Sequence, residues 1–446
     1  MTTTPGTRAS PPGRAGLRWR GALRHRNFRL FWFGQLISLV GTWMQSLAQA
    51  WLVLILTHDP FWLGIVAAFQ FLPVLVLGLF GGVIADVLPK RSTLIGTQVA
   101  SMLLALVLAG LTFANVAQVW HILVLAALLG LVNAVDMPTR QAFVVEMVGR
   151  EDVTNAIGLN SAMFNAARII GPAIGGLLIG ALGVTACFFI NGLSFVAVIG
   201  GLLLMREADF FPTARLARPT SVRGVVDNLA EGLRYVRATP VVLLAVVLVG
   251  LVSTFAMNFN VVAPALAQDV LGVGATGLGF LMASMGLGSL TAALVVASFR
   301  RPRPWVIVLG ALGLGALELI LAGVRSYPVA LVAMYGAGVA AIAMMISANT
   351  SIQLAVPDRL RGRVLSVYTT VFAGSTPIGA PVIGWLASAF STEVALAVGG
   401  GIAVGGALVA GAWILRGGLS AAPVGRDQLI PEAVGAGGQP PGSPGR

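Results

Sequence analysis

The chain has 446 residues, of which 57% are hydrophobic and only 10% are charged, and its formal net charge is +12. Soluble domains carry about 25% charged residues, so this composition excludes an ordinary soluble protein. The single cysteine, Cys187, excludes an intramolecular disulfide. The positive charge lies on short loops and tails and not on one folded basic face. We therefore expect contacts with anionic lipid headgroups and no nucleic-acid partner.

Apolar stretches that are long enough to cross a bilayer, at about 20 residues each, follow one another from Leu30 to Leu415. Their predicted bounds are 30–56, 62–85, 92–113, 119–137, 155–182, 185–205, 241–267, 276–298, 304–324, 327–348, 363–390 and 393–415. The segment before the first stretch has no short apolar region with a cleavage site, so we interpret the first stretch as an uncleaved span. The predicted fold class is an all-α polytopic membrane protein with twelve transmembrane helices.

The basic residues alternate between the gaps that separate these spans. Of the 28 Lys and Arg residues, 26 lie in the two tails and in every second gap; Arg168 lies inside a span and Arg325 in a gap of the other set. Positively charged loops stay in the cytoplasm during insertion, so both termini are predicted to be cytoplasmic. Nearly all basic residues are Arg, which is typical of a GC-rich bacterial genome. We expect a multi-pass protein of the bacterial plasma membrane.

The longest internal polar stretch divides the chain into two halves of six spans. We predict a basic, disordered cytoplasmic tail over 1–27, a six-helix bundle over 28–205, a linker over 206–240, a second bundle over 241–416 and a disordered tail over 417–446. In the linker, Leu229, Leu233 and Val236 recur at helical spacing opposite charged residues, which predicts an amphipathic helix on the cytoplasmic surface. We interpret this helix as a packing strut between the halves; a regulatory or lipid-sensing role is the alternative.

The two halves repeat weakly. At a shift of 209 residues, Pro172 matches Pro381 and Gly175 matches Gly384. Duplicated halves are typical of secondary transporters, in which one half rocks against the other around a site at the midplane. The repeat therefore predicts two pseudo-symmetric bundles.

The segment between the second and third spans carries a recognisable motif. It reads Gly82-Val83-Ile84-Ala85-Asp86-Val87-Leu88-Pro89-Lys90-Arg91. This resembles the signature loop of the major facilitator superfamily, and the resemblance covers essentially all of 28–416. It implies a conformational latch of the outward-open state. In that latch Gly82 allows close helix contact, Asp86 accepts hydrogen bonds from a helix N-terminus of the other half, and Lys90 and Arg91 anchor the loop. Val87 and Pro89 depart from the family pattern, which has a basic residue and a glycine there.

A Gly-Pro segment of the fifth span resembles the motif of proton-driven exporters of this superfamily. It contains Gly171, Pro172, Gly175 and Gly176, and we expect these small residues to form a close helix seam between the halves. Gly-rich membrane packing is the alternative interpretation. The stretches Phe28 to Gln35, Asp136 to Gln141, Asn165 to Pro172 and Asn228 to Val236 resemble the macrolide-efflux and enterobactin-exporter-like branch. That branch implies export of amphipathic compounds or siderophores by proton antiport.

Three charged residues inside predicted spans need a reason, because a charge at the centre of a membrane helix costs at least about 2.5–3.5 kcal/mol. Arg168, near the middle of the fifth span, binds an anionic substrate group, takes part in gating or pairs with a carboxylate of another helix. Glu318 is a proton-coupling candidate or an interhelical hydrogen-bonding group. Asp136 is a second proton-coupling candidate or half of an i,i+4 pair with Arg140.

Polar residues on the first span share one helical face at a period of about 3.6 residues. Since the first, fourth, seventh and tenth helices line the cavity in the superfamily, the resemblance makes Gln45 and Gln49 the leading substrate-contact candidates. The other substrate-binding candidates are Asn133, Asn165, Arg168, Asn258 and Asn260.

The predicted function is a secondary active transporter, in monomeric form, that exports small amphipathic compounds with the proton as coupling ion. We expect no enzyme activity, metal or cofactor, because the sequence has three His residues, all at or outside span ends, and no metal-ligand spacing or nucleotide-binding loop. An uptake carrier for a nutrient and a transporter-derived sensor or channel are the alternatives.

Overall fold

The computed structural model describes residues 21–212, 222–298 and 303–419, and this part of the chain is helical throughout apart from short connections. The first half contains η1 (Ala22–Arg24), α1 (Arg26–Thr57), α2 (Pro60–Val87), α3 (Lys90–Phe113), α4 (Val119–Leu182), α5 (Val184–Leu203) and η2 (Glu207–Asp209). After α6 (Val222–Ala238), the second half contains α7 (Pro240–Phe255), α8 (Phe259–Ala265), η3 (Leu266–Val270), α9 (Gly274–Ala297), α10 (Pro304–Gly323), α11 (Tyr327–Ala355), α12 (Asp358–Ala389) and α13 (Thr392–Leu415).

In the described part of the chain, 11 helical segments are long and apolar enough to cross a membrane. One of them, α4, has 64 residues and at about 1.5 Å per residue is roughly three times as long as a bilayer is thick. Gly149 interrupts it with φ 70° and ψ 175°, a left-handed conformation that favours glycine. The two parts of α4 on either side of Gly149 are therefore separate crossings, which confirms the predicted twelve helices.

The seventh crossing is also irregular. It consists of α7, α8 and the π-helical η3, with a break after Phe255. The Asn258 side chain donates from Nδ2 to the Thr254 carbonyl at 2.7 Å and so satisfies a carbonyl at the break. Irregular backbone at membrane depth is tolerated where protein buries it, and Asn258 is buried.

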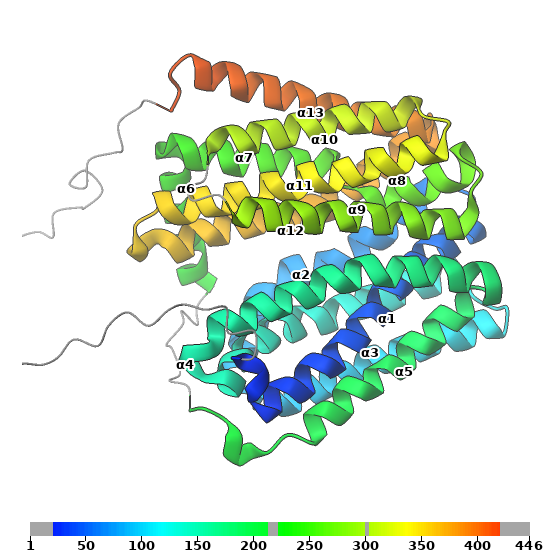
Figure 1. Cartoon of the computed structure of the whole chain (residues 1–446), viewed down its shortest axis with the longest axis vertical. Coiled ribbons are helices and arrows are strands. Elements are labelled where there is room, and N and C mark those ends of the chain that lie inside the picture. Colours follow the sequence, from blue (N-terminus) through cyan, green and yellow to red (C-terminus); the bar gives the residue numbers. More distant parts are fainter. Residues whose placement is uncertain (1–20, 213–221, 299–302, 420–446) are drawn as a thin grey trace, which may run out of the picture.

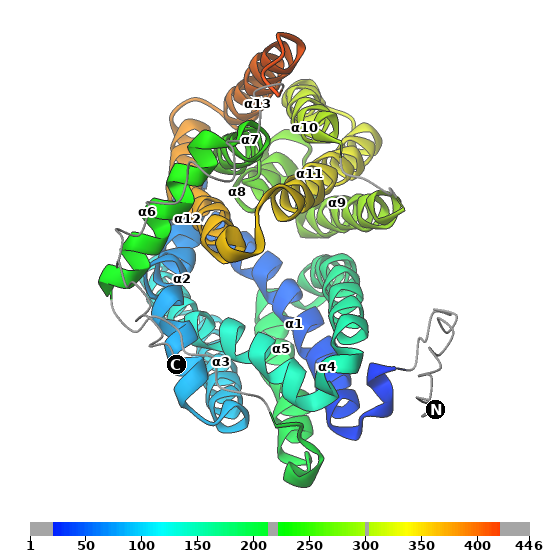
Figure 2. The same cartoon turned by 90° about the vertical axis from the view of Figure 1, so that its left-hand side faces the viewer.

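The helices form two bundles, α1–α5 and α7–α13, that lie beside each other (Figure 1). We call the end of the molecule with the α2–α3 junction, Gly149 and α6 the basic face, and the end with the α1–α2 and α12–α13 junctions the opposite face. Figure 2 views the molecule from the basic face, where α6 lies along α12. The Tyr235 hydroxyl of α6 donates to the Ala355 carbonyl at 3.0 Å, and Glu231 forms an ion pair with Arg363.

The halves meet along α2–α12 and α4–α9. A Cβ added at Gly64 of α2 would lie 2.2 Å from the Ala380 carbonyl oxygen of α12. One added at Gly384 would lie 2.9 Å from the Pro60 carbonyl oxygen, and one at Gly176 would lie 2.8 Å from that of Ala275. All three glycines lie in the half of the molecule nearer the opposite face, so the bundles touch backbone to backbone there.

Several helices extend beyond their predicted ends at the basic face. The tenth crossing, α11, runs to Ala355 and not to residue 348, and α12 begins at Asp358 and not at residue 363. Hydropathy falls where the bilayer ends, but the helical hydrogen bonds continue because these turns still bury apolar side chains such as Ile352 and Leu360. The apolar pattern therefore predicts the length of the apolar span, whereas packing determines where the helix ends.

Candidate functional site

The first bundle contains a cavity of about 430 Å³ that we call the polar cavity. It lies in the half of the bundle nearer the basic face. Its residues come from α1, α2, α3, α4 and α5: Phe31, Gln35, Ser38, Leu39, Thr42, Gln70, Gln98, Ser101, Leu129, Asn133, Asp136, Met137, Arg140, Gln141, Val144, Asn160, Met163, Phe164 and Phe195. Carboxylate, guanidinium and amide groups stand beside aromatic and aliphatic side chains, as in sites for small organic molecules.

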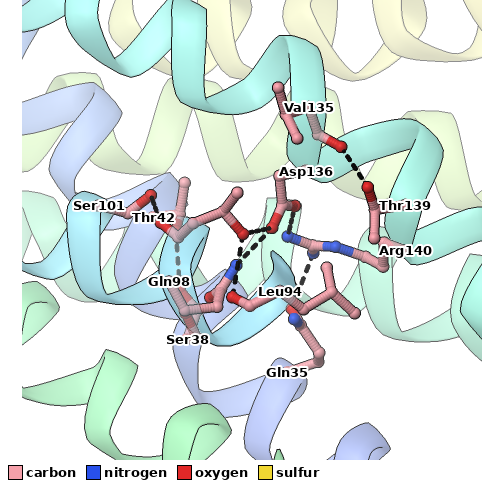
Figure 3. Close-up of polar contacts among 11 residues, drawn as sticks. Gln35, Ser38, Thr42, Leu94, Gln98, Ser101, Val135, Asp136, Thr139 and Arg140 are labelled. Atoms are coloured by element: carbon pink, nitrogen blue, oxygen red, sulfur yellow. Dashed lines mark hydrogen bonds and ion pairs between the residues drawn. The ribbon is translucent and has the colours of Figure 1, made fainter. Parts of the chain in front are cut away.

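A charged network forms one wall of the polar cavity (Figure 3). Asp136 is only 1% exposed and forms an ion pair with Arg140, one helical turn further along α4. Two side chains of α3 donate to the same carboxylate: Thr97 through Oγ1 at 2.7 Å and Gln98 through Nε2 at 2.8 Å. The negative charge is thus fully solvated by protein groups, which is what a buried carboxylate requires.

The network continues to α1, where two of its hydrogen-bond donors have no acceptor. Arg140 donates through Nη1 to Oε1 of Gln35 at 2.8 Å. Gln35 Nε2 and Arg140 Nε are buried and have no hydrogen-bond acceptor in the described part of the protein. A buried donor without an acceptor costs about 1–3 kcal/mol. These two donors could therefore each form a hydrogen bond to an oxygen atom of a ligand.

A second, much smaller space of about 20 Å³ lies where the two bundles meet, and we call it the seam pocket. It is lined by residues of α1, α4, α8 and α9: Trp43, Ser46, Leu47, Ala50, Pro172, Phe259, Asn260, Pro264, Leu278 and Met282. Its walls are mainly apolar, and Asn260 supplies an amide. The seam pocket is lined by α8 of the seventh crossing and by the start of α9, so it lies nearer the opposite face than the polar cavity does.

Arg168 of α4 lines neither space, but it lies on the helix between Phe164, which lines the polar cavity, and Pro172, which lines the seam pocket. Its guanidinium lies 6.0 Å from the ring centroid of Trp43 of α1, within cation–π range. Among the described residues, no acidic side chain forms an ion pair with it. A charged group of this kind inside a membrane bundle marks a functional position by default.

The other predicted substrate contacts divide into two groups. Asn133 lines the polar cavity and Asn260 lines the seam pocket. Gln45 accepts from Asn191 Nδ2 of α5 at 2.7 Å, and Asn165 Nδ2 donates to the Ser161 carbonyl of its own helix at 2.9 Å. Gln45 and Asn165, like the buried Gln49 and Asn258, are not among the residues that line the two spaces.

Glu318, the other proton-coupling candidate, lies away from both spaces. It is 3% exposed on α10, and its Oε2 has no hydrogen-bond partner in the described part of the protein. It faces glycines of α13: a Cβ at Gly399 would lie 3.1 Å from Oε2, and one at Gly400 would lie 3.0 Å from the Glu318 Cβ. A side chain at Gly399 would therefore crowd the carboxyl group, and one at Gly400 would crowd the Cβ of Glu318.

The Gly-Pro segment of α4, predicted to form a seam between the halves, makes close contacts on two sides, and only part of it faces the other half. A Cβ at Gly171 would lie 2.5 Å from the Cβ of Trp43, and one at Gly175 would lie 3.2 Å from the Met44 side chain, so these glycines contact α1. Gly176 faces α9, where the Thr276 hydroxyl donates to its carbonyl at 3.0 Å. The Pro172 carbonyl oxygen is 2.6 Å from a Cβ position at Gly279, so this stretch of α4 contacts both α1 and the other half.

The basic pair of the predicted latch binds within its own half. Lys90 forms an ion pair with Glu146 at 2.6 Å. Arg91 donates to the Leu202 carbonyl at 2.9 Å and pairs with Glu207 at 2.9 Å. Gly82 and Asp86 lie on α2, but their side-chain surroundings fall outside the described part of the structure.

Thr97 and Gln98 are site residues that sequence analysis missed. Together with Ser101, which also faces the cavity, they form a polar patch inside the otherwise apolar third span. The signal was the same as that of the first span, a cluster of polar residues on one helical face. The polar cluster of the third span covers fewer helical turns than that of the first span, so it is a weaker signal in the sequence.

Two bundles of six crossings with a repeat between them are the architecture of many secondary transporters. The family described as transmembrane secretion effector, within the major facilitator superfamily, matches residues 20–432, so this chain belongs to that family. Membership of this family makes it a multi-pass membrane transporter and not an enzyme.

Efflux proteins are among the chain's relatives. It is 29% identical to the multidrug efflux pump Tap of Mycolicibacterium fortuitum, over 81% of this chain and 89% of that protein. It is 26% identical to the enterobactin exporter EntS of Escherichia coli, over 84% and 89%. A staphyloferrin A transporter of Staphylococcus aureus is 30% identical, but the match covers only 38% of this chain and 44% of that protein.

Solved structures support the fold alone. A bacterial homologue of the human lysosomal transporter Spinster, in an inward-facing and unoccupied conformation, superposes with a TM-score of 0.66. The two chains are 14% identical, and the superposition covers 90% of this chain and 98% of the other.

Proposed function

We propose that this transporter exports small amphipathic compounds by alternating access and that protons moving inward drive the export. The observation that carries the proposal is the polar cavity, which combines a charged network with apolar and aromatic walls inside a two-bundle transporter. A compound with an apolar body and a polar head matches such walls. The family's efflux-type members support export as the direction.

In this proposal the basic face is cytoplasmic, following the distribution of Lys and Arg. The polar cavity then lies on the cytoplasmic side, and the close contacts at Gly64, Gly176 and Gly384 close the other side. Substrate enters from the cytoplasm or the inner leaflet. The two halves then rock against each other about the glycine contacts. In the outward-open state, the latch residues Asp86 and Lys90 would hold the halves together at the basic face.

The coupling group in this proposal is a carboxyl group that alternately binds a proton. Asp136 is the first candidate because it lines the cavity, and its protonation would weaken its pair with Arg140 and free that cation. Glu318 is the second candidate because one of its buried oxygens has no partner in the described structure. Antiport requires that the conformational change with the proton bound and the one with substrate bound run in opposite directions, and a carboxyl group whose charge sets the state of Arg140 could couple the two.

Transport into inverted vesicles tests the proposal. Vesicles with an acidic interior should accumulate a fluorescent amphiphile, and an uncoupler should abolish the accumulation. Asp136→Asn should remove the response to the pH gradient and retain exchange of substrate without a gradient. Glu318→Gln is the parallel variant, and Glu393→Gln, at an exposed ion pair of the opposite face, is the control.

Three results would contradict parts of this proposal. Accumulation that requires an alkaline interior would indicate uptake. Normal gradient-driven transport by both Asp136→Asn and Glu318→Gln would remove both coupling candidates. Accumulation that survives the uncoupler would remove the proton as driving ion.

A further inference from the structure

The charges around the two spaces do not balance, and the excess is one cation. Among the described residues that line the polar cavity, Asp136 and Arg140 alone are charged, and they neutralise each other. The residues known to line the seam pocket, all from the described ranges, are uncharged. Arg168 is not among the residues that line either space, but it has no acidic partner in the described structure and lies beside Trp43 of the seam-pocket wall, so it adds one unbalanced positive charge to this region.

The position of Arg168 on α4 makes it available to a ligand in this region. Phe164, one helical turn earlier, lines the polar cavity, and Pro172, one turn later, lines the seam pocket. Residues four apart share a helical face, so Arg168 belongs to the stripe that faces both spaces. Trp43, which stacks near its guanidinium, is itself part of the seam-pocket wall.

The surroundings of Arg168 are aromatic. Trp43 contacts Phe164 edge-to-face, with ring centroids 5.6 Å apart, and Phe259 lies across the seam pocket on α8. A cation–π contact is a weaker partner for a guanidinium than a carboxylate is, because a carboxylate accepts two charge-assisted hydrogen bonds. An anionic group would therefore replace the Trp43 ring as the partner of the Arg168 guanidinium. An apolar body attached to it would pack on the rings of Trp43 and Phe164.

We infer that the substrates are amphipathic anions, with a carboxylate or phenolate head bound by Arg168 and an apolar or aromatic body held by Trp43 and Phe164. That the bound anion is the transported substrate rests on the proposed function. Binding of the anion at Arg168 stands independently of transport.

Binding to the purified full-length chain in phosphatidylcholine nanodiscs tests the inference, since that lipid offers no net negative headgroup. The probes are a dansylated medium-chain carboxylate, its uncharged methyl ester and the corresponding quaternary ammonium. Binding is followed by energy transfer from the tryptophans of the chain to dansyl. The native chain should bind the carboxylate at least about tenfold more tightly than the ester.

Variants at Arg168 then assign the preference. Arg168→Gln should weaken carboxylate binding about tenfold or more and leave ester binding unchanged, which also shows that the variant is folded. Arg168→Lys should retain most of the preference. Equal or tighter binding of the ester or the ammonium by the native chain, or equal weakening of ester and carboxylate in Arg168→Gln, would overturn the inference.

Vesicle transport of the same probes separates this inference from the proposed function. If the carboxylate binds through Arg168 but no probe crosses the membrane, the anion site is supported and the export proposal fails. If the ester or ammonium is exported while the carboxylate neither binds nor moves, export is supported and the anion site fails.

Discussion

Asp136 and Arg140 show how single residues make a polar site tolerable inside a membrane bundle. Their spacing of four residues places them on one face of α4, and Thr97 and Gln98 complete the coordination of the carboxylate. Each charge alone would be strongly unfavourable in this position. The pair therefore depends on both members, and removing one leaves an uncompensated charge.

Removing the Asp136 carboxylate should destabilise the protein more than removing the whole pair. Asp136→Leu should lower the free energy of unfolding by up to about 3–5 kcal/mol, because the half-buried Arg140 loses its carboxylate partner and the Thr97 and Gln98 donors lose their acceptor. The double variant Asp136→Leu/Arg140→Met should recover most of this loss. Unfolding in detergent, followed by tryptophan fluorescence, measures the difference.

Glu393→Gln provides the comparison for this prediction. It removes the ion pair with Arg325, whose side chain is 59% exposed, and should change stability by less than about 1 kcal/mol. If the Asp136 and Arg140 double variant were as unstable as the single one, the pair would not be the source of the effect.

At the scale of elements, the approach of α4 to α9 depends on missing side chains. A Cβ added at Gly279 would lie 2.6 Å from the Pro172 carbonyl oxygen and 2.8 Å from the Gly176 Cα. Both neighbours are backbone atoms, which cannot rotate away. The helices can lie this close only because Gly176 and Gly279 face each other, as in other small-residue membrane contacts.

Gly279→Ala should therefore separate α9 from α4, with a loss of about 1–3 kcal/mol in stability and a clear decrease in transport rate. Gly96→Ala on α3 is the matched control, since a Cβ there has nothing within 4 Å. The control should be neutral or slightly stabilising, by up to about 1 kcal/mol. Thermal unfolding and vesicle transport of both variants at equal expression test this; equal behaviour of the two would show that the contact is not tight.

At the scale of the whole molecule, alternating access requires the contacts on the opposite face to open. Gly180 of α4 and Thr276 of α9 face each other across the halves, with 4.0 Å between a Cβ position at Gly180 and the Thr276 Cβ. This separation suits a disulfide. A covalent link here would hold the halves together at that face without closing the polar cavity.

In a Cys187→Ser background, Gly180→Cys with Thr276→Cys should form a disulfide that stops transport, and a reductant should restore it. Gly313→Cys with Ala340→Cys is the control, because a Cβ at Gly313 lies 3.5 Å from the Ala340 Cβ within the second bundle. That link should leave transport unchanged. Undiminished transport by the cross-linked first pair would exclude rocking about this seam.

The twelve crossings followed from the sequence by itself, because hydropathy and the placement of Lys and Arg are local properties that a bilayer reads directly. The superfamily was indicated by a resemblance, that of the Gly82–Arg91 segment to the family's signature loop. The four-residue spacing of Asp136 and Arg140 also identified their pair. These features depend on neighbours along the chain and need no knowledge of which helix lies beside which.

The tertiary structure decided which members of each polar stripe face a cavity. Gln35 and Gln45 lie on the same stripe of α1, yet Gln35 contacts Arg140 in the polar cavity whereas Gln45 contacts Asn191 between α1 and α5. In the same way, only the packing of α3 against α4 places Thr97 and Gln98 on Asp136, and only the packing of α1 places Trp43 on Arg168. The physical reason is that a helix changes neighbours along its length, so equal spacing in the sequence does not imply an equal environment.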